Sequence, residues 1–258
     1  MGFRTFTAMA DFKYVGAELD LFAEVHNWKT YWSRSIRRFI GGDVLEVGAG
    51  IGANTRYLDS GVAGQWVALE PDAELAARLA NNLEQYTRQP AYESAIGAIG
   101  KLPPSRKFDT IVYIDVLEHI EKDREELKNA ASLLRPGGRI VVLAPAHQWL
   151  FTPFDAAIGH FRRYNRAMMR NIGPPELLLE RTVYLDSAGL VLSMANLLLL
   201  RQSMPTKRQL AIWDRWVIPV SRVLDQCFFH ALGKSIVGVW RRRGELGPPA
   251  AATVRQSR

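Results

Sequence analysis

A glycine-rich turn after a short apolar strand is the strongest chemical signal in the chain. Residues 44–52 read VLEVGAGIG, so Glu46 lies inside the strand and Gly48, Gly50 and Gly52 follow it. Glycines at such a turn let backbone N–H groups approach a ligand closely, because no side chain lies in the way. The turn leads directly into a helical pattern, which favours a nucleotide-like cofactor at the crevice above a parallel sheet.

The second predicted strand ends in an acid that is placed to hold the sugar of that cofactor. Glu70 closes the strand 22 residues after Gly48, and Pro71 follows it. A carboxylate at this position accepts hydrogen bonds from both ribose hydroxyls of a nucleoside. The spacing is not the G-x-G-x-x-G of dinucleotide-binding proteins, and the turn lacks a phosphate-binding G-K-[ST]. The residues therefore favour an adenosine cofactor without a pyrophosphate, with S-adenosylmethionine as the first choice.

Four segments, in this order and spacing, resemble the class I S-adenosylmethionine-dependent methyltransferases, the group that includes the ubiquinone-pathway O-methyltransferases. The resemblance covers the middle half of the chain and implies an enzyme that uses S-adenosylmethionine and releases S-adenosylhomocysteine. The segments are VLEVGAGIGANT at 44–55, ALEPD at 68–72, FDTIVYIDVLEHIEKD at 108–123 and LLRPGGRIVVLAPAH at 133–147.

The resemblance also assigns cofactor contacts. Glu46 is expected either to bind the methionine ammonium or to orient the turn. Family members often carry an acid against the adenine, whereas the matching position here is Ala98, which implies a backbone and apolar contact instead. The expected cofactor contacts are Glu46, Gly48, Ala49, Gly50, Glu70, Pro71, Ala98, Ile99, Asp115, Val116 and His119.

Three histidines fall near the expected mouth of the site. His147 directly follows the fifth predicted strand and is the favoured general base, with His160 and His119 as the other catalytic choices. A base is needed only if the acceptor is a hydroxyl or an unactivated carbon acid, and it must then reach the proton that it removes.

The run D-V-L-E-H offers a second kind of chemistry. Asp115, Glu118 and His119 supply two carboxylates and an imidazole, which suit Mg²⁺ or Mn²⁺ moderately well. The ubiquinone-pathway O-methyltransferases and the small-RNA 2′-O-methyltransferases place similar runs around a divalent metal. Many metal-free relatives carry the same run, so we expect no metal and keep this set as the alternative.

Substrate contacts are expected from two other segments. Arg163 and Tyr164, next to His160, suit a phosphate or carboxylate, because arginine forks match such groups, or else they pin their own loop. Trp28 and Tyr31 lie in a leading helical segment and are expected either at the substrate wall or in the core. The apolar, tryptophan-rich stretch 190–240 is expected to be a helical cover over the sheet. A groove for a hydrophobic or lipid-like acceptor, or peripheral contact with a membrane, would give the same composition.

Strand and helix patterns alternate around these residues, which indicates an α/β fold: a Rossmann-like, seven-stranded, mostly parallel sheet with helices on both faces. An N-terminal helical lid and a C-terminal helical embellishment are expected to flank it. The predicted units are a helical cap at 1–42, a cofactor-binding core at 43–200, a helical insertion with the last strand at 201–243, and a disordered tail at 244–258. Strands are expected near 43–48, 66–70, 91–96, 109–114, 138–144, 190–196 and 234–240, and helices near 53–60, 72–87, 120–134, 175–188 and 209–229.

Composition and charge narrow the function classes. The chain has 258 residues and a formal net charge of +7, and its single cysteine, Cys227, suits a reducing cytoplasm. The first residues do not read as a secretory signal, because charged residues interrupt them. We find no nucleic-acid-binding module and expect no specific nucleic acid. O-methylation of a small molecule is favoured, and the alternatives are an RNA or protein methyltransferase or a non-catalytic Rossmann-like binding protein. No prediction of oligomeric state follows from these features.

Overall fold

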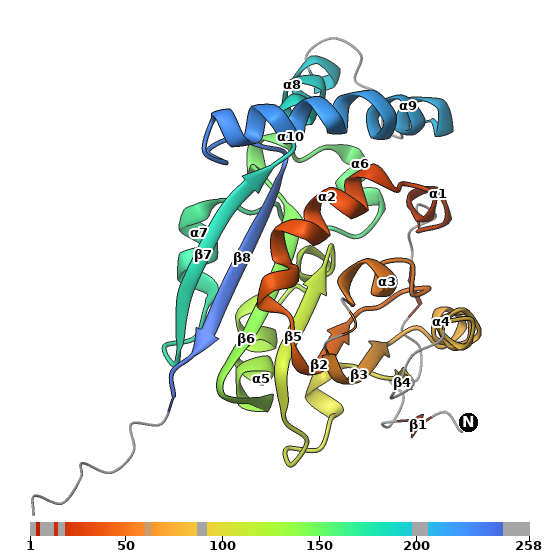
Figure 1. The fold of residues 1–258 in the computed structure, drawn as a ribbon, viewed down its shortest axis with the longest axis vertical. Coiled ribbons are helices and arrows are strands. Elements are labelled where there is room, and N and C mark those ends of the chain that lie inside the picture. Colours follow the sequence, from red (N-terminus) through yellow and green to blue (C-terminus); the bar gives the residue numbers. More distant parts are fainter. Residues whose placement is uncertain are drawn as a thin grey trace, which may run out of the picture.

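An eight-stranded sheet forms the centre of the molecule (Figure 1), in the order β1-β4-β3-β2-β5-β6-β8-β7. In the computed structural model the described residues are 4–5, 13–14, 19–59, 61, 63–86, 92–197 and 206–244. Strand β8 runs antiparallel to both of its neighbours, and the other pairs are parallel. The predicted sheet of seven mostly parallel strands is confirmed, with two-residue β1 added at one edge. The strands are β1 (Arg4–Thr5), β2 (Gly42–Val47), β3 (Ala63–Glu70), β4 (Glu93–Ile96), β5 (Phe108–Ile114), β6 (Leu134–Pro145), β7 (Leu177–Leu185) and β8 (Ser235–Arg242).

Helices cover both faces of the sheet because neighbouring strand residues point to opposite sides. Leu45 packs in one cluster with Leu127 and Met169, whereas the adjacent Val44 packs in another with Trp32 and Ile218. The longer helices are α1 (Leu19–Ala23), α2 (Asn27–Ile36), α3 (Thr55–Leu58), α4 (Ala73–Glu84), α5 (Asp123–Leu133), α6 (Pro153–Ala157), α7 (Arg166–Ile172), α8 (Ser187–Ala195), α9 (Lys207–Ile212) and α10 (Ile218–Cys227). Short turns of helix are η1 (Arg37–Phe39), η2 (Ile99–Lys101), η3 (Leu117–His119), η4 (Gln148–Leu150) and the π-helical η6 (Trp213–Val217).

The prediction for residues 175–196 was wrong, since the helix and the strand exchange places. The segment expected to be a helix is β7, and the expected sixth strand lies within α8. A short apolar run such as 190–196 has the same periodicity in a buried strand and in a helix. Gly189 looked like the end of a helix, but it lies in the first turn of α8, where its N–H donates to the capping carboxylate of Asp186.

The N-terminal helix α2 is tied to the C-terminal helices by a buried carboxylate. Asp214 accepts hydrogen bonds from the backbone N–H groups of His26, Asn27 and Trp28, at distances of 2.8–3.1 Å. These are the orphan donors at the start of α2, so a residue far along the chain caps this helix. Segments from the two ends of the sequence therefore share one hydrophobic cluster, with α2 in front of the strands and α9 and α10 across the end toward which β7 points (Figure 1).

None of the helices in the described ranges has the length and apolar composition that a bilayer crossing requires. From residue 245 onward, the expected disordered tail lies outside the described residues. Residues 198–205, where the predicted core ends and the predicted helical insertion begins, lie outside them as well.

Candidate functional site

The turn after β2 has the backbone shape that its glycines predict. Gly48, Gly50 and Gly52 have φ angles of +64°, +57° and +79°, which side-chain-bearing residues rarely adopt. A Cβ atom on Gly48 would lie 2.7 Å from a methyl carbon of Val116, which follows β5. The turn therefore needs glycine both for its conformation and for its close approach to the neighbouring strand end.

The acid at the end of β3 meets this turn. Glu70 accepts a hydrogen bond from the Gly50 N–H at 2.8 Å through Oε2 and one from the Asp72 N–H at 3.0 Å through Oε1. Burial raises the pKa of Glu70 to about 7, against the effect of these two hydrogen bonds. The glycine turn and the acid thus lie together at the carboxyl edge of the sheet.

The next strand end lies beside Glu70 as well. The Gly97 N–H donates to the Glu70 carbonyl at 3.0 Å, so the segment after β4 runs along the same edge. Ala98 is partly exposed there, whereas Ile99 is 1% exposed and packs in the core. Ala49 of the turn is also buried. Between the buried Gly97 and Ile99, Ala98 is therefore the residue that is open to a ligand.

Glu46 points its bonded oxygen into the protein. Its Oε2 accepts from the Thr55 hydroxyl at 2.8 Å and from the Trp66 indole N–H at 3.1 Å. The side chain is 2% exposed, and burial raises its pKa to about 7. Since Thr55 begins α3, these contacts hold the turn and helix on the sheet, which supports the orienting role rather than direct contact with a cofactor.

Replacing Glu46 with glutamine should change the free energy of unfolding in a pH-dependent way. The variant should gain stability relative to wild type as the pH rises from 5 to 8. The folded pKa of about 7 lies above the ordinary value of 4.5, so the folded state binds this proton more tightly, and stability is lost as pH rises between the two values. Glutamine does not titrate, and the variant should gain on the order of 2–3 kcal/mol over this window. Denaturant unfolding at both pH values measures the gain, with exposed Glu74→Gln as the control. An equal difference at both pH values would contradict it.

A lysine from α2 reaches the glycine turn. Lys29 is 5% exposed, and its Nζ donates to the carbonyls of Ala23 and Ala53, each at 3.3 Å. Burial and, to a smaller extent, the charge of the nearby Arg56 lower its pKa to about 8. A buried ammonium beside this turn offers a partner for a carboxylate.

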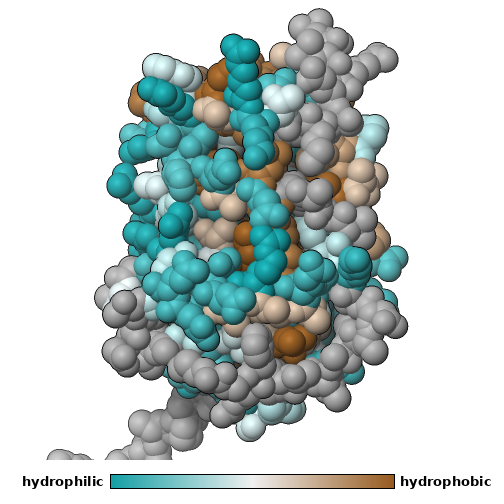
Figure 2. Space-filling view, turned by 90° about the vertical axis from the view of Figure 1, so that its right-hand side faces the viewer, coloured by the Kyte–Doolittle hydropathy of each residue, from teal (hydrophilic) through white to brown (hydrophobic). Residues whose placement is uncertain are grey.

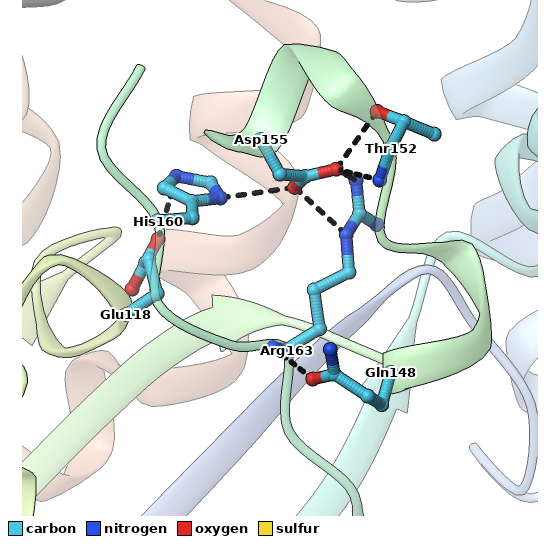
Figure 3. Close-up of polar contacts among 6 residues, drawn as sticks. All are labelled: Glu118, Gln148, Thr152, Asp155, His160 and Arg163. Carbon is cyan, nitrogen blue, oxygen red and sulfur yellow. Dashed lines mark hydrogen bonds and ion pairs between the residues drawn. The ribbon is translucent and has the colours of Figure 1, made fainter. Parts of the chain in front are cut away.

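A second cluster forms around Asp155, at the start of α6 (Figure 3). Asp155 is fully buried and accepts from His160 Nδ1 at 2.9 Å, from Arg163 at 2.8 and 3.0 Å, and from the N–H and hydroxyl of Thr152. These contacts hold the pKa of Asp155 well below its ordinary value despite burial. The resulting carboxylate keeps a proton on Nδ1 of His160, which leaves Nε2 as the atom with a free electron pair.

Nε2 of His160 faces a buried acid on η3. Glu118 is 0% exposed, and neither of its carboxylate oxygens has a hydrogen-bond partner among the described residues. One of them lies 3.9 Å from His160 Nε2 (Figure 3). Burial raises the pKa of Glu118 well above its ordinary range. An unpartnered buried carboxylate is costly, so this atom pair marks a place where a ligand would relieve the cost.

His119 completes this group. Its ring lies edge-on to that of His160, with 4.5 Å between ring centroids, and burial lowers its pKa to about 4. Each of Glu118, His119 and His160 offers one possible ligand atom, and these three atoms lie within 4.8 Å of one another. A carboxylate and two imidazoles are suitable ligands for a divalent cation. Asp155 bonds the other ring nitrogen of His160, Nδ1, as a carboxylate commonly does to orient a metal-binding imidazole. This set differs from the predicted one, since His160 takes the place of Asp115.

Asp115 lies at the end of β5 with a φ of +53°, a strained conformation for a residue other than glycine. Solvent reaches its side chain, yet the surrounding protein raises its pKa to about 6, while the charges of His160, Lys234 and Lys29 oppose that rise. Charged groups from three other segments therefore act on this carboxyl, which marks the opening of the site.

His147 follows β6, as the sequence predicted, and its ring has other partners than Glu118 and His160. Its ring stacks on Tyr184 at 4.8 Å, and its Nε2 lies 3.0 Å from the Gly233 carbonyl, to which it donates. Its backbone has a φ of +66°. The ring is thus held between β7 and the start of β8 rather than in the group of Glu118 and His160.

All four expected substrate residues have partners within the protein. Trp28 and Tyr31 are 7% and 8% exposed in the core, and the Tyr31 hydroxyl donates to Asp225 at 2.6 Å. Tyr164 is fully buried beneath η3 and bonds the Leu117 carbonyl at 3.1 Å. Together with the Arg163–Asp155 pair, these contacts correspond to the structural alternatives that the sequence left open.

Sequence reasoning missed Lys29, Asp155 and Lys234. Lys29 had a signal, because a lysine stands within the apolar face of a helix that is otherwise buried. The spacing of Thr152 and Asp155 is that of a capping box, which predicts the helix start but not the bond to His160. Nothing local distinguishes Lys234, whose Nζ lies over the Trp213 ring at 4.2 Å.

Comparisons with known proteins bear on the family and the fold of the chain. The model of a family described as a methyltransferase domain matches residues 25–177. A demethylmenaquinone methyltransferase of Tropheryma whipplei is 31% identical over 133 residues, which cover 48% of this chain. The matched stretches span between 52% and 60% of the length of the curated methyltransferases that the chain resembles.

Solved structures share the fold. A geranyl diphosphate methyltransferase in complex with S-adenosylmethionine superposes with a TM-score of 0.60 at 13% identity, covering 92% of this chain and 93% of that one. The N-methyltransferase NodS of Bradyrhizobium japonicum, in complex with S-adenosylhomocysteine, gives 0.51 at 15% identity, covering 84% and 85%. At these identities the likeness concerns the fold, which confirms the predicted Rossmann-like architecture.

Proposed function

Because the chain belongs to the methyltransferase-domain family, we propose that it transfers the methyl group of S-adenosylmethionine to an oxygen of a small apolar acceptor. The observation that carries this proposal is the contact between the glycine turn and Glu70, which places backbone N–H groups and a buried carboxylate at one edge of the sheet. The products are the methyl ether or ester and S-adenosylhomocysteine.

Each end of the cofactor has a partner in this arrangement. Glu70 holds the ribose, with Pro71 beside it, and the turn at Gly48 and Gly50 lies against the amino-acid end. Lys29 binds the methionine carboxylate, because its ammonium is the buried cation beside the turn. Asp115, Val116 and His119 border the sulfonium, and Ala98 contacts the adenine.

Chemistry at the acceptor requires alignment and the removal of a proton. S-adenosylmethionine supplies a methyl group that is already activated, and proximity accounts for about 7–11 kcal/mol of the barrier. The acceptor oxygen bonds to the methyl carbon, and the carbon–sulfur bond breaks with its electron pair going to sulfur. His160 Nε2 takes the hydroxyl proton, because Asp155 keeps the other ring nitrogen protonated and in place.

The unpartnered carboxylate of Glu118 favours a second candidate, in which a divalent cation is bound by Glu118, His119 and His160. Such a cation would polarise the acceptor oxygen and lower the pKa of its hydroxyl. Asp155 would then orient a metal ligand instead of a base. The two candidates share the same residues and differ in what occupies the space between Glu118 and His160.

An apolar acceptor is supported by the helices above the site. Exposed apolar side chains gather on α8, η6 and α10, at the end of the sheet where Glu70 and Asp115 lie. A lipid-like molecule met at a membrane surface fits this composition. An RNA or protein acceptor instead predicts binding that weakens steeply with salt.

One set of experiments tests this function. Calorimetry should show saturable S-adenosylmethionine binding, and mass spectrometry should find the methyl group on oxygen when apolar acceptors with hydroxyl, amine or activated carbon groups compete. No heat of binding at millimolar cofactor would refute the use of S-adenosylmethionine, and an N-methyl product would refute transfer to oxygen.

A separate titration tests the cation: chelator-treated protein is titrated with Mn²⁺. The second candidate requires binding that Asp155→Asn weakens about 10–100-fold and exposed Glu121→Gln leaves unchanged, whereas absent binding leaves His160 as the base.

A further inference from the structure

The helices at the carboxyl end of the sheet expose an unusual number of large apolar side chains. On η6 and α10 they include Trp216 at 64% exposure and Val223 at 63%, and on α8 they include Val191 at 65%. Side chains of this size are normally turned inward, and a contiguous exposed group marks an interaction surface. On α8, α9, η6, α10 and the turn after α10, the exposed large apolar residues are Val191, Leu192, Met194, Ile212, Trp216, Val220, Val223, Phe228, Phe229 and Leu232.

The charges around this surface have one sign. Lys207, Arg208, Arg215 and Arg222 are exposed on α9, η6 and α10. The acids within 187–197 and 206–234 are Asp214 and Asp225, and both are buried, where they bind backbone N–H groups. An apolar face bordered by cations and free of exposed acids complements an anionic bilayer, whose headgroups attract lysine and arginine while its interior accepts apolar side chains.

The turn after α10 holds the phenyl ring of Phe229 in solvent. Phe229 is 88% exposed and has a φ of +51°, and the next residue, His230, has +54°. Two consecutive side-chain-bearing residues in this conformation are strained. The turn is nevertheless held in place, because the His230 N–H donates to the Asp225 carbonyl at 2.7 Å and Arg166 donates to the His230 carbonyl at 2.8 Å. The exposed ring is therefore a fixed feature of the surface.

This surface and the candidate site lie at the same end of the molecule. The β7 arrow points toward α8 and α10 in Figure 1, and Asp225 of α10 binds the N–H of Asp186 directly after β7. Figure 2 shows hydrophobic residues beside hydrophilic ones at the top of the molecule, the end that α8–α10 occupy in Figure 1.

We infer that α8, α9, η6, α10 and the turn at 228–232 form a docking face for an anionic membrane, on which the protein lies while it takes an amphiphilic acceptor from the lipid. The docking rests on the surface alone, and the delivery of the acceptor rests on the proposed function. Trp216, Val223 and Phe229 enter the headgroup region, and Arg215 and Arg222 contact lipid phosphates.

Vesicle sedimentation of the whole chain, without cofactor or acceptor, tests the docking. Binding to vesicles of phosphatidylcholine with phosphatidylglycerol should exceed binding to phosphatidylcholine alone, and it should fall as salt is raised. The double variant Arg215→Gln and Arg222→Gln should weaken binding about 25-fold, at about fivefold for each arginine. The variant Trp216→Gln with Phe229→Ser should weaken binding to both kinds of vesicle. Leu178→Gln, an exposed apolar residue of β7, is the matched control.

Two outcomes would overturn the inference. One is equal or absent binding to both vesicle types by the folded wild-type chain. The other is a self-associated species in analytical ultracentrifugation that Trp216→Gln dissolves, with no vesicle binding, because the face would then serve a second copy of the chain. Calorimetry with S-adenosylmethionine is run on the same protein, so that a failure of docking is told apart from a failure of the proposed function.

Discussion

Replacing His160 with alanine should lower kcat about 10²–10⁴-fold and leave the affinity for S-adenosylmethionine within a fewfold of wild type. The imidazole is the group with a free nitrogen beside Glu118, and its other nitrogen is held by Asp155 at 2.9 Å. Removing it takes away either the proton acceptor or one ligand of a cation. The cofactor contacts that we propose lie on other elements, so the effect should fall on the chemical step.

Asp155→Asn separates orientation from chemistry at the same place. The amide cannot keep the proton on Nδ1 as a carboxylate does, and it also loses one charge-assisted bond from Arg163. We expect kcat to fall while the ring of His160 remains. His26→Ala, an exposed histidine at the start of α2, is the control. If His147→Ala removed activity and His160→Ala did not, the assignment of the base would be wrong.

Replacing Glu70 with glutamine should weaken S-adenosylmethionine binding about 10–100-fold, since a hydrogen bond to a charged group contributes about 1.5–3 kcal/mol. Each carboxylate oxygen accepts one backbone N–H, from Gly50 and from Asp72. An amide presents an NH₂ group to one of these donors, so the variant loses part of the support of the turn as well as an acceptor for the ribose.

Calorimetric titration measures the loss, and circular dichroism confirms that the variant is folded. Glu74→Gln is the matched control, because Glu74 follows on α4 but is exposed. If Glu70→Gln left the affinity unchanged, the ribose would bind elsewhere. The contact between Glu70 and the glycine turn would then no longer support the proposed function.

Short-range features were predictable from the sequence because neighbouring residues determine them. The glycines at 48, 50 and 52 permit the positive φ angles of the turn, and the acid that closes β3 follows from the strand pattern and a fixed count of residues. The family resemblance and the mostly parallel sheet follow from the order of four such segments. The exchange of β7 and α8 shows the limit, because an apolar run has no period that separates a buried strand from a helix.

The chemistry at the mouth of the site was decided by the tertiary structure. Glu118 and His160 are far apart in the chain, and only the crossing of their loops brings their side chains within 3.9 Å. The ring of His147, which follows its strand as the sequence predicted, is turned by Tyr184 and the Gly233 carbonyl. Lys29 reaches the glycine turn because Asp214, a residue of another helix, fixes the start of α2. Sequence spacing determines where a residue lies on its own strand or helix, whereas the direction of its side chain depends on partners that the fold brings from elsewhere.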